Sequence, residues 1–309
     1  MTVALEIEHL TKDYEVGFLR KRRVRALDDL SLTVERGEIY GFLGANGAGK
    51  STTMKLLMRL IYPTGGRAAI LGRDINDVSM HARIGYLPEQ PYFYDYLTAR
   101  ELLEYCAELF GHTRRDCRQR AEELLARVRL DEQSWDKQLR KFSKGMLQRV
   151  GLAQALVNDP EIVFLDEPMS GLDPVGRREV RDLIASLRQR STTVFLCSHI
   201  LADIEVLCDR AAILQRGRLA HVGRLEDLRR RAGTRAMELI IANANADRLR
   251  AALRELPAAE VTSTPGGARV EVPSEQEVDA ALACVRTTGA RLVSVQPVGN
   301  PLEDLFTSN

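Results

Sequence analysis

The sequence lacks the features that would let the chain span a membrane, cross-link itself or bind zinc. Its 309 residues contain no run of about 18 or more apolar residues, the least that a membrane-spanning helix needs. No charged-then-apolar leader opens the chain. There are five cysteines, without a C-x-x-C pair or zinc-ligand spacing: Cys106, Cys117, Cys197, Cys208 and Cys284. Such scattered cysteines indicate free thiols in a reducing compartment, and we expect the cytosol.

The sequence also lacks a large net charge of either sign. The chain has 44 basic and 43 acidic residues, a formal net charge of +1. No overall field would draw it to nucleic acid, so we expect no nucleic-acid partner. The length allows one large or two smaller domains, and the 45% hydrophobic content is ample for a buried core.

Aromatic residues are scarce, at 6% of the chain, yet four of them gather in the segment Pro91–Tyr96. Two interpretations are open. Exposed aromatics favour interfaces, so the cluster could contact another protein. Alternatively, the same side chains anchor a local core.

The segment Gly44–Thr52 fits the G-x-x-x-x-G-K-[ST] pattern of a nucleotide phosphate cradle. Glycines let backbone N–H groups converge on phosphate oxygens, while Lys50 adds a positive charge and Ser51 would hold Mg²⁺. The preceding run Ile39–Leu43 predicts a buried strand, and Lys50–Leu60 predicts a helix whose N-terminus faces the anion. The residues expected to bind nucleotide here are Gly44, Ala45, Asn46, Gly47, Ala48, Gly49, Lys50, Ser51 and Thr52.

A second strand, Ile162–Asp166, ends in two carboxylates, Asp166 and Glu167. At the sheet edge beside a phosphate cradle, Asp166 would bind Mg²⁺ through water. Glu167, pointing elsewhere, would polarise the water that attacks the γ-phosphate.

Up to about residue 222, short β-rich runs alternate with amphipathic helices, which predicts an α/β domain with a largely parallel sheet. Thr192–Cys197 is another expected strand, and Ser198 and His199 follow its end. Asp173 is the expected N-cap of a helix from Pro174 to about Arg190. Residues from about 98 to 158 carry helical periodicity instead, in Glu101–Phe110 and Ala121–Arg129, and indicate a helical insert.

After Gly223 a second domain is expected. Strands are predicted at Met237–Ile241, Glu260–Thr264, Ala268–Val272 and Arg291–Gln296, and helices at Asp247–Leu256 and Ser274–Thr287. This βαββαβ order indicates a small α+β ferredoxin-like module.

In order along the chain, these motifs resemble those of the ATP-binding subunit of an ABC transporter. Gln90 resembles the family's Q-loop residue, Ser170–Asp173 its D-loop and His199 its switch histidine. The family's signature sequence, Leu-Ser-Gly-Gly-Gln, is altered here to Phe142–Met146, in which Ser143 and Gly145 are retained. The resemblance implies a P-loop NTPase fold over residues 1–222, with a RecA-like core, an antiparallel β subdomain and a helical subdomain at about 91–160, followed by a small domain at 223–309.

The resemblance also implies site roles. Catalysis would rest on Glu167, His199, Gln90 and Lys50, and Mg²⁺ would be held by Ser51, Gln90 and Asp166. Ser143 is a good N-cap, so its hydroxyl, Gly145 and the helix end could address a phosphate. In the family this helix serves the nucleotide of the opposite protomer, and Asp173 is assigned to nucleotide binding with it. Tyr14 resembles the aromatic that stacks on adenine, although a tyrosine in a β-region also often simply packs.

The partners implied are a second copy of the chain and a membrane permease at the cytoplasmic face of the membrane, with ATP and Mg²⁺ as ligands. The altered signature and the ending Pro301–Phe306 resemble those of ABC-2 type exporters. Import stays open, and the alternative is a soluble ABC ATPase acting on ribosomes or nucleic acid. A regulatory role of the small domain would add to either function.

The segment Val16–Arg25, which includes the basic run Arg20–Arg25, lengthens the path from Tyr14 to the cradle. It predicts a solvated loop, and contact with anionic lipid headgroups is a further hypothesis.

Overall fold

The computed structural model describes residues 2–17, 21–231, 236–254, 256 and 258–298. The chain divides into two compact units, Met1–Leu225 and Glu226–Asn309. The sequence placed this boundary after residue 222. The segment Pro301–Phe306 lies outside the described residues.

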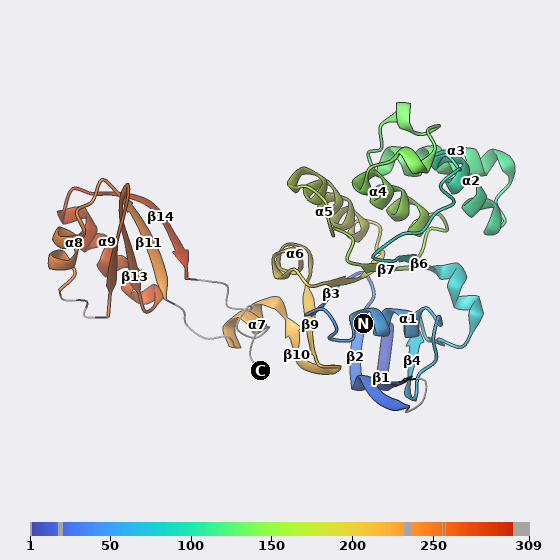
Figure 1. Ribbon diagram of the computed structural model, residues 1–309, viewed down its shortest axis with the longest axis horizontal. Helices are drawn as coiled ribbons and strands as arrows, with labels where there is room; N and C mark the ends of the chain where they lie inside the picture. The colour runs from blue at the N-terminus through green and yellow to red at the C-terminus, as the bar shows by residue number, and fades with distance from the viewer. Residues whose placement is uncertain (1, 18–20, 232–235, 255, 257, 299–309) are drawn as a thin grey trace. The chain divides into compact units, whose positions relative to one another are not determined.

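A six-stranded sheet, counted over the described residues, forms the centre of the first unit, in the order β10-β9-β3-β8-β7-β6 (Figure 1). Its strands are β3 (Ile39–Gly44), β6 (Ile84–Leu87), β7 (Ile162–Asp166), β8 (Thr193–Ser198), β9 (Arg210–Gln215) and β10 (Arg218–Arg224). All neighbours pair in parallel except β10, which is antiparallel to β9. Every residue of β3, β7 and β8 is buried, as expected for a parallel sheet covered on both faces. The three strands predicted from apolar runs are thus confirmed.

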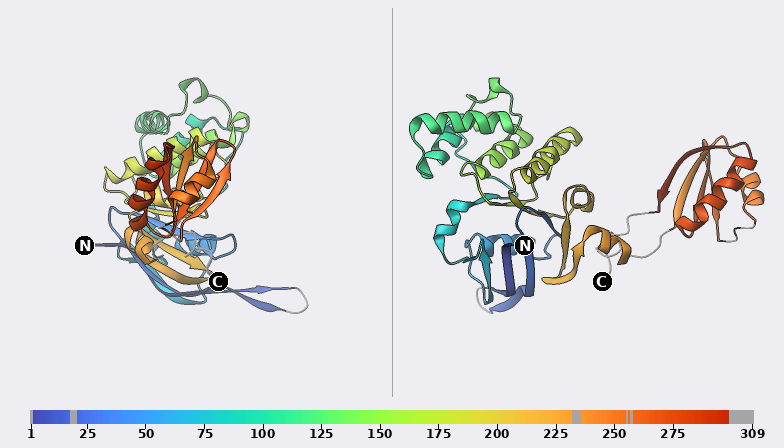
Figure 2. Two further views of the ribbon diagram at one scale, coloured as in Figure 1. Left: turned by 90° about the vertical axis from the view of Figure 1, so that its left-hand side faces the viewer. Right: turned by 180° about the vertical axis from the view of Figure 1, so that it is seen from behind.

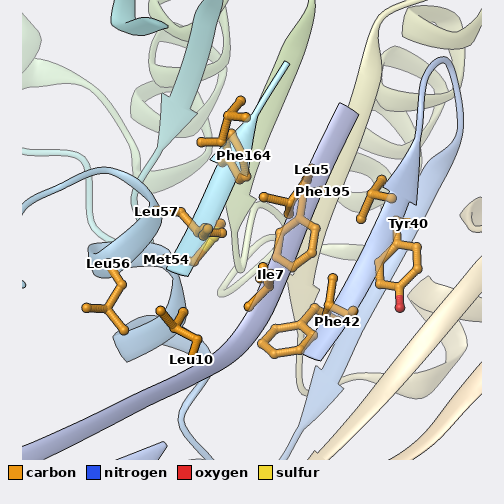
Figure 3. Close-up of a cluster of buried hydrophobic side chains, with 14 of the residues drawn as sticks. Leu5, Ile7, Leu10, Tyr40, Phe42, Met54, Leu56, Leu57, Phe164 and Phe195 are labelled. Atoms are coloured by element: carbon orange, nitrogen blue, oxygen red, sulfur yellow. The ribbon is translucent and has the colours of Figure 1, made fainter. Parts of the chain in front are cut away.

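An antiparallel sheet packs beside the central one, with strand order β2-β1-β4-β5. It consists of β1 (Val3–Val16), β2 (Arg22–Glu35), β4 (Gly65–Ile70) and the short β5 (Arg73–Asp74). Between the sheets lies one hydrophobic core, which also takes in helix α1 (Lys50–Leu57). Figure 3 shows its side chains converging, among them Leu5 of β1, Phe42 of β3 and Phe195 of β8.

The expectation of a loop is wrong for Arg22–Arg25 of the basic run, whereas Arg20 lies outside the described residues. Strands β1 and β2 form a hairpin arm, with Tyr14 paired to Val24 and Val16 to Arg22 (Figure 2, left). Pairing satisfies the backbone of both strands, and opposite charges meet on the arm: Lys21 contacts Glu15 at 2.8 Å and Arg25 contacts Asp13 at 2.9 Å. Arg22–Arg25 therefore lie on a strand rather than in a loop.

Between β6 and β7 the chain is helical, as predicted. The helices are α2 (Ala99–Leu109), α3 (Arg114–Arg127) and α4 (Lys144–Ala155), with 3₁₀ turns at Glu132–Ser134 and Leu139–Lys141. Helix α3 begins well before the expected Ala121, because Thr113 caps it by accepting a hydrogen bond from the Asp116 N–H. The remaining helical segments of this unit are the 3₁₀ turn η1 (Val78–Arg83), α5 (Pro174–Arg188) and α6 (Leu201–Leu207), followed by α7 (Leu225–Arg231) at the division between the units.

The second unit has the element order expected from the sequence: β11 (Met237–Ala242), α8 (Ala246–Ala252), β12 (Glu260–Thr264), β13 (Gly267–Val272), α9 (Val278–Thr287) and β14 (Arg291–Pro297). Its antiparallel strands lie in the order β12-β13-β11-β14. Its own core includes Leu239, Val270 and Val285. Helix α9 starts later than the predicted Ser274, because a 3₁₀ turn at Glu275–Glu277 precedes it.

Phe195 is the packing centre of the first unit, because its ring lies 5.3–5.8 Å from those of Tyr40, Phe42 and Phe164. We predict that Phe195→Ala lowers the free energy of unfolding by about 3–5 kcal/mol. A urea titration followed by fluorescence of Trp135, the one tryptophan of the chain, measures this. Val206→Ala is the control, since Val206 is 66% exposed and its loss should change the free energy by at most about 0.5 kcal/mol. Equal shifts in both variants would contradict this packing role.

Candidate active site

The glycine-rich loop joins β3 to α1 at the carboxyl edge of the central sheet. Gly49, the N-cap of α1, has φ +114°, and a Cβ there would lie 2.8 Å from the Ala26 carbonyl oxygen. A side chain at this position would therefore be strained and crowded. The buried Lys50 side chain folds back over the loop, and its Nζ donates to the Gly44 carbonyl oxygen at 2.6 Å.

Two buried carboxylates end β7 beside this loop. Asp166 is 4% exposed and Glu167 is 6% exposed. Glu167 has φ +50°, and its N–H donates to the Cys197 carbonyl oxygen at 3.0 Å. A positive φ is uncommon for a residue other than glycine, so the turn after β7 is sharp at Glu167.

Glu167 is held between two basic groups. Its Oε1 lies 3.4 Å from Lys50 Nζ, and its Oε2 lies 2.9 Å from His199 Nδ1. His199 follows β8, the strand next to β7, so adjacent strand ends bring the pair together. Among the described residues, Glu167 Oε1 and Asp166 Oδ1 are buried acceptors without a hydrogen-bond partner. These two oxygens can therefore accept a hydrogen bond or bind a cation.

Asp166 is electrostatically strained. Burial, and then the charges of Glu167 and Glu89, raise the pKa of Asp166 to about 6, against the opposing effects of a Ser51 hydrogen bond and the Lys50 cation. A cation bound beside the carboxylate would relieve this strain.

A cavity of about 530 Å³ opens over the glycine-rich loop. It is lined by Ala26, Ala45, Asn46, Gly47, Gly49, Lys50, Ser51, Thr52, Glu89, Glu167, Ser170 and His199. Most of the expected loop residues, together with Glu167 and His199, therefore share one cavity. Gly44, Ala48 and Asp166 are buried and do not line it.

Gln90 and Tyr14 do not line this cavity either. Gln90 is exposed, and the preceding Glu89 lines the cavity in its place. Tyr14 is half-buried on β1, with Lys12 Nζ 5.2 Å from its ring centroid. Sequence reasoning missed Ala26 and Glu89. Glu89 was adjacent to the Q-loop glutamine and carried a readable signal, whereas nothing in the sequence marks Ala26.

The altered signature sequence lies at a second cavity, of about 370 Å³, which shares no lining residue with the first over the described part of the chain. Ser143 caps α4 through Met146 N–H at 3.3 Å, and Asp173 caps α5 through Gly176 N–H at 3.2 Å. Both line this cavity with Gly145. The structure thus brings Ser143, Gly145 and Asp173 together, away from the glycine-rich loop of the same chain.

The aromatic segment before α2 is mostly exposed. Tyr92, Tyr94 and Tyr96 are 98%, 55% and 60% exposed. Phe93 is half-buried near Gly151, so only this member packs as part of a local core. The three tyrosines form an exposed patch, which we call the tyrosine patch.

Comparisons with known proteins show what the chain is similar to. The family described as "ABC transporter" matches residues 27–170. An uncharacterized ABC transporter ATP-binding protein of Synechocystis sp. is 50% identical over 225 residues, 72% of this chain and 64% of that protein. The uncharacterized ABC transporter ATP-binding protein YxlF of Bacillus subtilis is 35% identical over 305 residues, 98% of each chain. The chain belongs to the family of ABC transporter ATP-binding proteins.

A transport protein and a solved structure are also similar to this chain. The bacitracin transport ATP-binding protein BcrA of Bacillus licheniformis is 43% identical over 210 residues, 67% of each chain. A solved dimeric ATP-binding cassette in a post-hydrolysis state, bound to ADP and Pi, is 27% identical with a TM-score of 0.66, over 72% of this chain and 98% of that one. The first unit therefore has the P-loop NTPase fold of these cassettes. The chain spans 64% of the length of the Synechocystis protein and 66% of the length of an uncharacterized ABC transporter ATP-binding protein of Nostoc sp., to which it is 51% identical over 220 residues.

In the described part of the ATP-binding protein, no helix is both long and apolar enough to cross a membrane. Within the same residues, no three or more His, Cys, Asp or Glu side chains gather as a metal site.

The raised pKa of Asp166 makes stability depend on pH. Folding takes up a proton between the unfolded pKa of about 4 and the folded value of about 6, so this carboxyl destabilises the protein increasingly as pH rises through that window. In metal-free buffer, we predict that Asp166→Asn raises the free energy of unfolding by about 2–3 kcal/mol above pH 7, and by less at pH 5. Urea titrations across this pH range measure the difference.

The control for this prediction is Asp182→Asn, at an exposed position on α5. A stability gain in Asp166→Asn that stays constant from pH 5 to pH 8, or no gain at any pH, would contradict the assigned cause.

Proposed function

We propose that the ATP-binding protein hydrolyses ATP and powers a membrane exporter of the ABC-2 type, working as a pair of identical subunits at the cytoplasmic face of the membrane. One observation carries the hydrolytic part of this proposal. A buried carboxylate, Glu167, lies between Lys50 and His199 in the cavity that contains the glycine-rich loop.

In the proposed reaction, backbone N–H groups of the loop and Lys50 hold the phosphates of ATP. Glu167 accepts a proton from a water molecule through Oε1, which is ion-paired with Lys50 but accepts no hydrogen bond, as that water attacks the γ-phosphorus. The bond from the γ-phosphorus to the bridging oxygen breaks, and ADP and phosphate leave. His199, hydrogen-bonded to the other oxygen of Glu167, fixes the direction of this carboxylate and senses the γ-phosphate.

The donor set beside the loop fits Mg²⁺. Asp166 offers a buried oxygen without a partner, and the Ser51 hydroxyl lies within hydrogen-bonding reach of Asp166. Asp166 and Ser51 would hold the ion, whereas Gln90, the third expected ligand, is exposed and does not line the cavity. When bound, Mg²⁺ neutralises charge on the phosphates, and it usually takes only one or two protein carboxylates because phosphates and water complete its shell.

The second cavity supports a paired arrangement. Ser143, Gly145 and Asp173 form a polar face that the loop of the same chain does not share. We propose that this face covers the nucleotide held by a second copy, as the signature sequence does in the family. The related cassette described as dimeric is a precedent. Tyr14 is proposed to stack on adenine, because it extends from the same β1–β2 hairpin whose Ala26 lines the nucleotide cavity.

The proposed export direction rests on the altered signature, and the likeness to the bacitracin transport protein supports a role in transport. The tyrosine patch directly follows Glu89 and Gln90, and we propose that it receives the membrane subunit. No observation favours the ribosomal or nucleic-acid alternative, and the relatives compared above are described as ABC transporter or bacitracin transport proteins.

The role of Glu167 is directly testable. We predict that Glu167→Gln lowers the ATP turnover rate by about 10²–10⁴-fold while ATP still binds, because the amide keeps the shape but loses the general base. Phosphate release measures turnover, and a fluorescent ATP analogue measures binding. Glu260→Gln, at an exposed strand position of the second unit, is the matched control and should retain full turnover. Unchanged turnover in Glu167→Gln would remove this carboxylate from the mechanism.

Capture of partners tests the transport assignment. We predict that a tagged Glu167→Gln chain, purified from detergent-solubilised cells with ATP, recovers a polytopic membrane protein. Adding Tyr92→Ala should reduce this recovery about tenfold or more without affecting ATP binding, since exposed aromatics supply much of the binding energy at interfaces. Tyr62→Ala is the control, because Tyr62 is an exposed tyrosine too, at 62%, but lies outside the patch. Recovery of ribosomes or nucleic acid without a membrane protein would support the soluble alternative instead.

A further inference from the structure

A third cavity, of about 360 Å³, lies at the end of the central sheet opposite to the active site. It is bordered by Pro160 and Glu161, which precede β7, and by Thr192 and Thr193, where β8 begins. Asp166 and His199 lie at the other ends of these strands. The volume is within the range of small-molecule sites. The proposed ATPase activity makes no use of this cavity.

The cavity wall carries more positive charge than its own carboxylates balance. It contains Arg36, Arg127, Arg190, Asp159 and Glu161. Both carboxylates are already engaged: Asp159 with Arg120 at 2.5 Å, and Glu161 with Arg36 at 2.8 Å and Arg83 at 2.5 Å. Over the described residues, no carboxylate pairs with Arg127 or Arg190.

Arg127 is half-buried and lies near like charges. Burial first, and then the cations of Arg190 and Arg120, lower the pKa of Arg127 below its usual value, against the opposing effect of the Asp159 carboxylate. Arg127 ends α3 and Arg190 follows α5, where the carbonyl end of a helix attracts cations. Those helix ends carry only about half a negative charge each, so they do not remove the mutual repulsion of two full cations.

The donors that face this cavity are side chains. The backbone N–H groups of the border residues are used internally; those of Ser191, Thr192 and Thr193 donate to Arg188, Leu187 and Glu161 carbonyl oxygens. The guanidinium groups and the Ser191 and Thr192 hydroxyls remain as the recognition groups. Guanidinium forks bind phosphate oxygens in pairs, which matches a compact oxyanion with several acceptors.

We propose that this cavity binds a small, doubly charged oxyanion, inorganic phosphate or a phosphate monoester, between Arg127 and Arg190. Arg127 belongs to the helical segment between β6 and β7, whereas Arg190 belongs to the connection from α5 to β8. The anion therefore bridges the helical subdomain and the central sheet.

Isothermal titration calorimetry on the full chain tests this site, with a saturating non-hydrolysable ATP analogue filling the phosphate cradle. The probes are inorganic phosphate and glycerol 3-phosphate. At least one should bind, and Arg127→Gln and Arg190→Gln should each raise its dissociation constant about tenfold or more, because each removes a charge-assisted hydrogen bond. Binding of both probes, or of inorganic phosphate alone, assigns free phosphate as a ligand, whereas binding of glycerol 3-phosphate alone assigns a phosphate ester.

Arg178→Gln is the matched control, because Arg178 is an exposed arginine of α5 outside the cavity. The Arg178→Gln variant should bind the phosphate probe with the same dissociation constant as the unaltered chain. If neither probe binds the unaltered chain, or if Arg178→Gln weakens binding as much as the cavity variants, the site is refuted. Circular dichroism verifies folding. Arg127→Lys, which keeps the charge but loses the fork, should weaken binding by an intermediate amount, and full affinity in this variant would also contradict the proposed geometry.

Discussion

The contact on which the active site depends is the buried pair of Lys50 and Glu167, 3.4 Å apart. Each side chain is at most 8% exposed, so each charge would be costly without the other. Lys50 comes from the start of α1, and Glu167 comes from the turn after β7, so the pair ties the phosphate cradle to the acidic strand end. His199 adds a third element through its hydrogen bond to Glu167. Three chain segments are thereby held in one arrangement at the edge of the sheet.

Packing beneath the sheet sets the positions of these strand ends. Three adjacent strands contribute aromatic rings that stack or tilt against one another, from Tyr40, Phe42, Phe164 and Phe195. All four side chains are fully buried. A close-packed interior resists small displacements, so the residues that follow β7 and β8 are held in register. The rigid part of the molecule thus lies directly below its chemistry, as expected of a site built on strand ends.

The N-cap residues Ser143 and Asp173 each stabilise a helix and also line a cavity. The Ser143 hydroxyl stabilises the start of α4, and the Asp173 carboxylate stabilises the start of α5, and both side chains border one cavity. A helix N-terminus carries partial positive charge, so the same geometry that satisfies the first-turn N–H groups also favours anions at this face. Capping therefore explains why these residues fold locally, while their convergence is a property of the tertiary structure.

The sequence alone determined the elements whose cause is local. The glycine pattern, the apolar strands before Gly44 and Asp166, and the caps at Ser143 and Asp173 follow from short-range sterics, burial and hydrogen bonding. Strand pairing between distant segments was not readable in this way. It turned Arg22–Arg25 from an expected loop into a strand, because β1 offered a partner, and it brought Ala26 and Glu89 to the cavity where Tyr14 and Gln90 were expected. Only the tertiary structure decided which charges meet, because electrostatic contacts such as Glu167 with His199, or Arg127 near Arg190, join residues that no local rule relates.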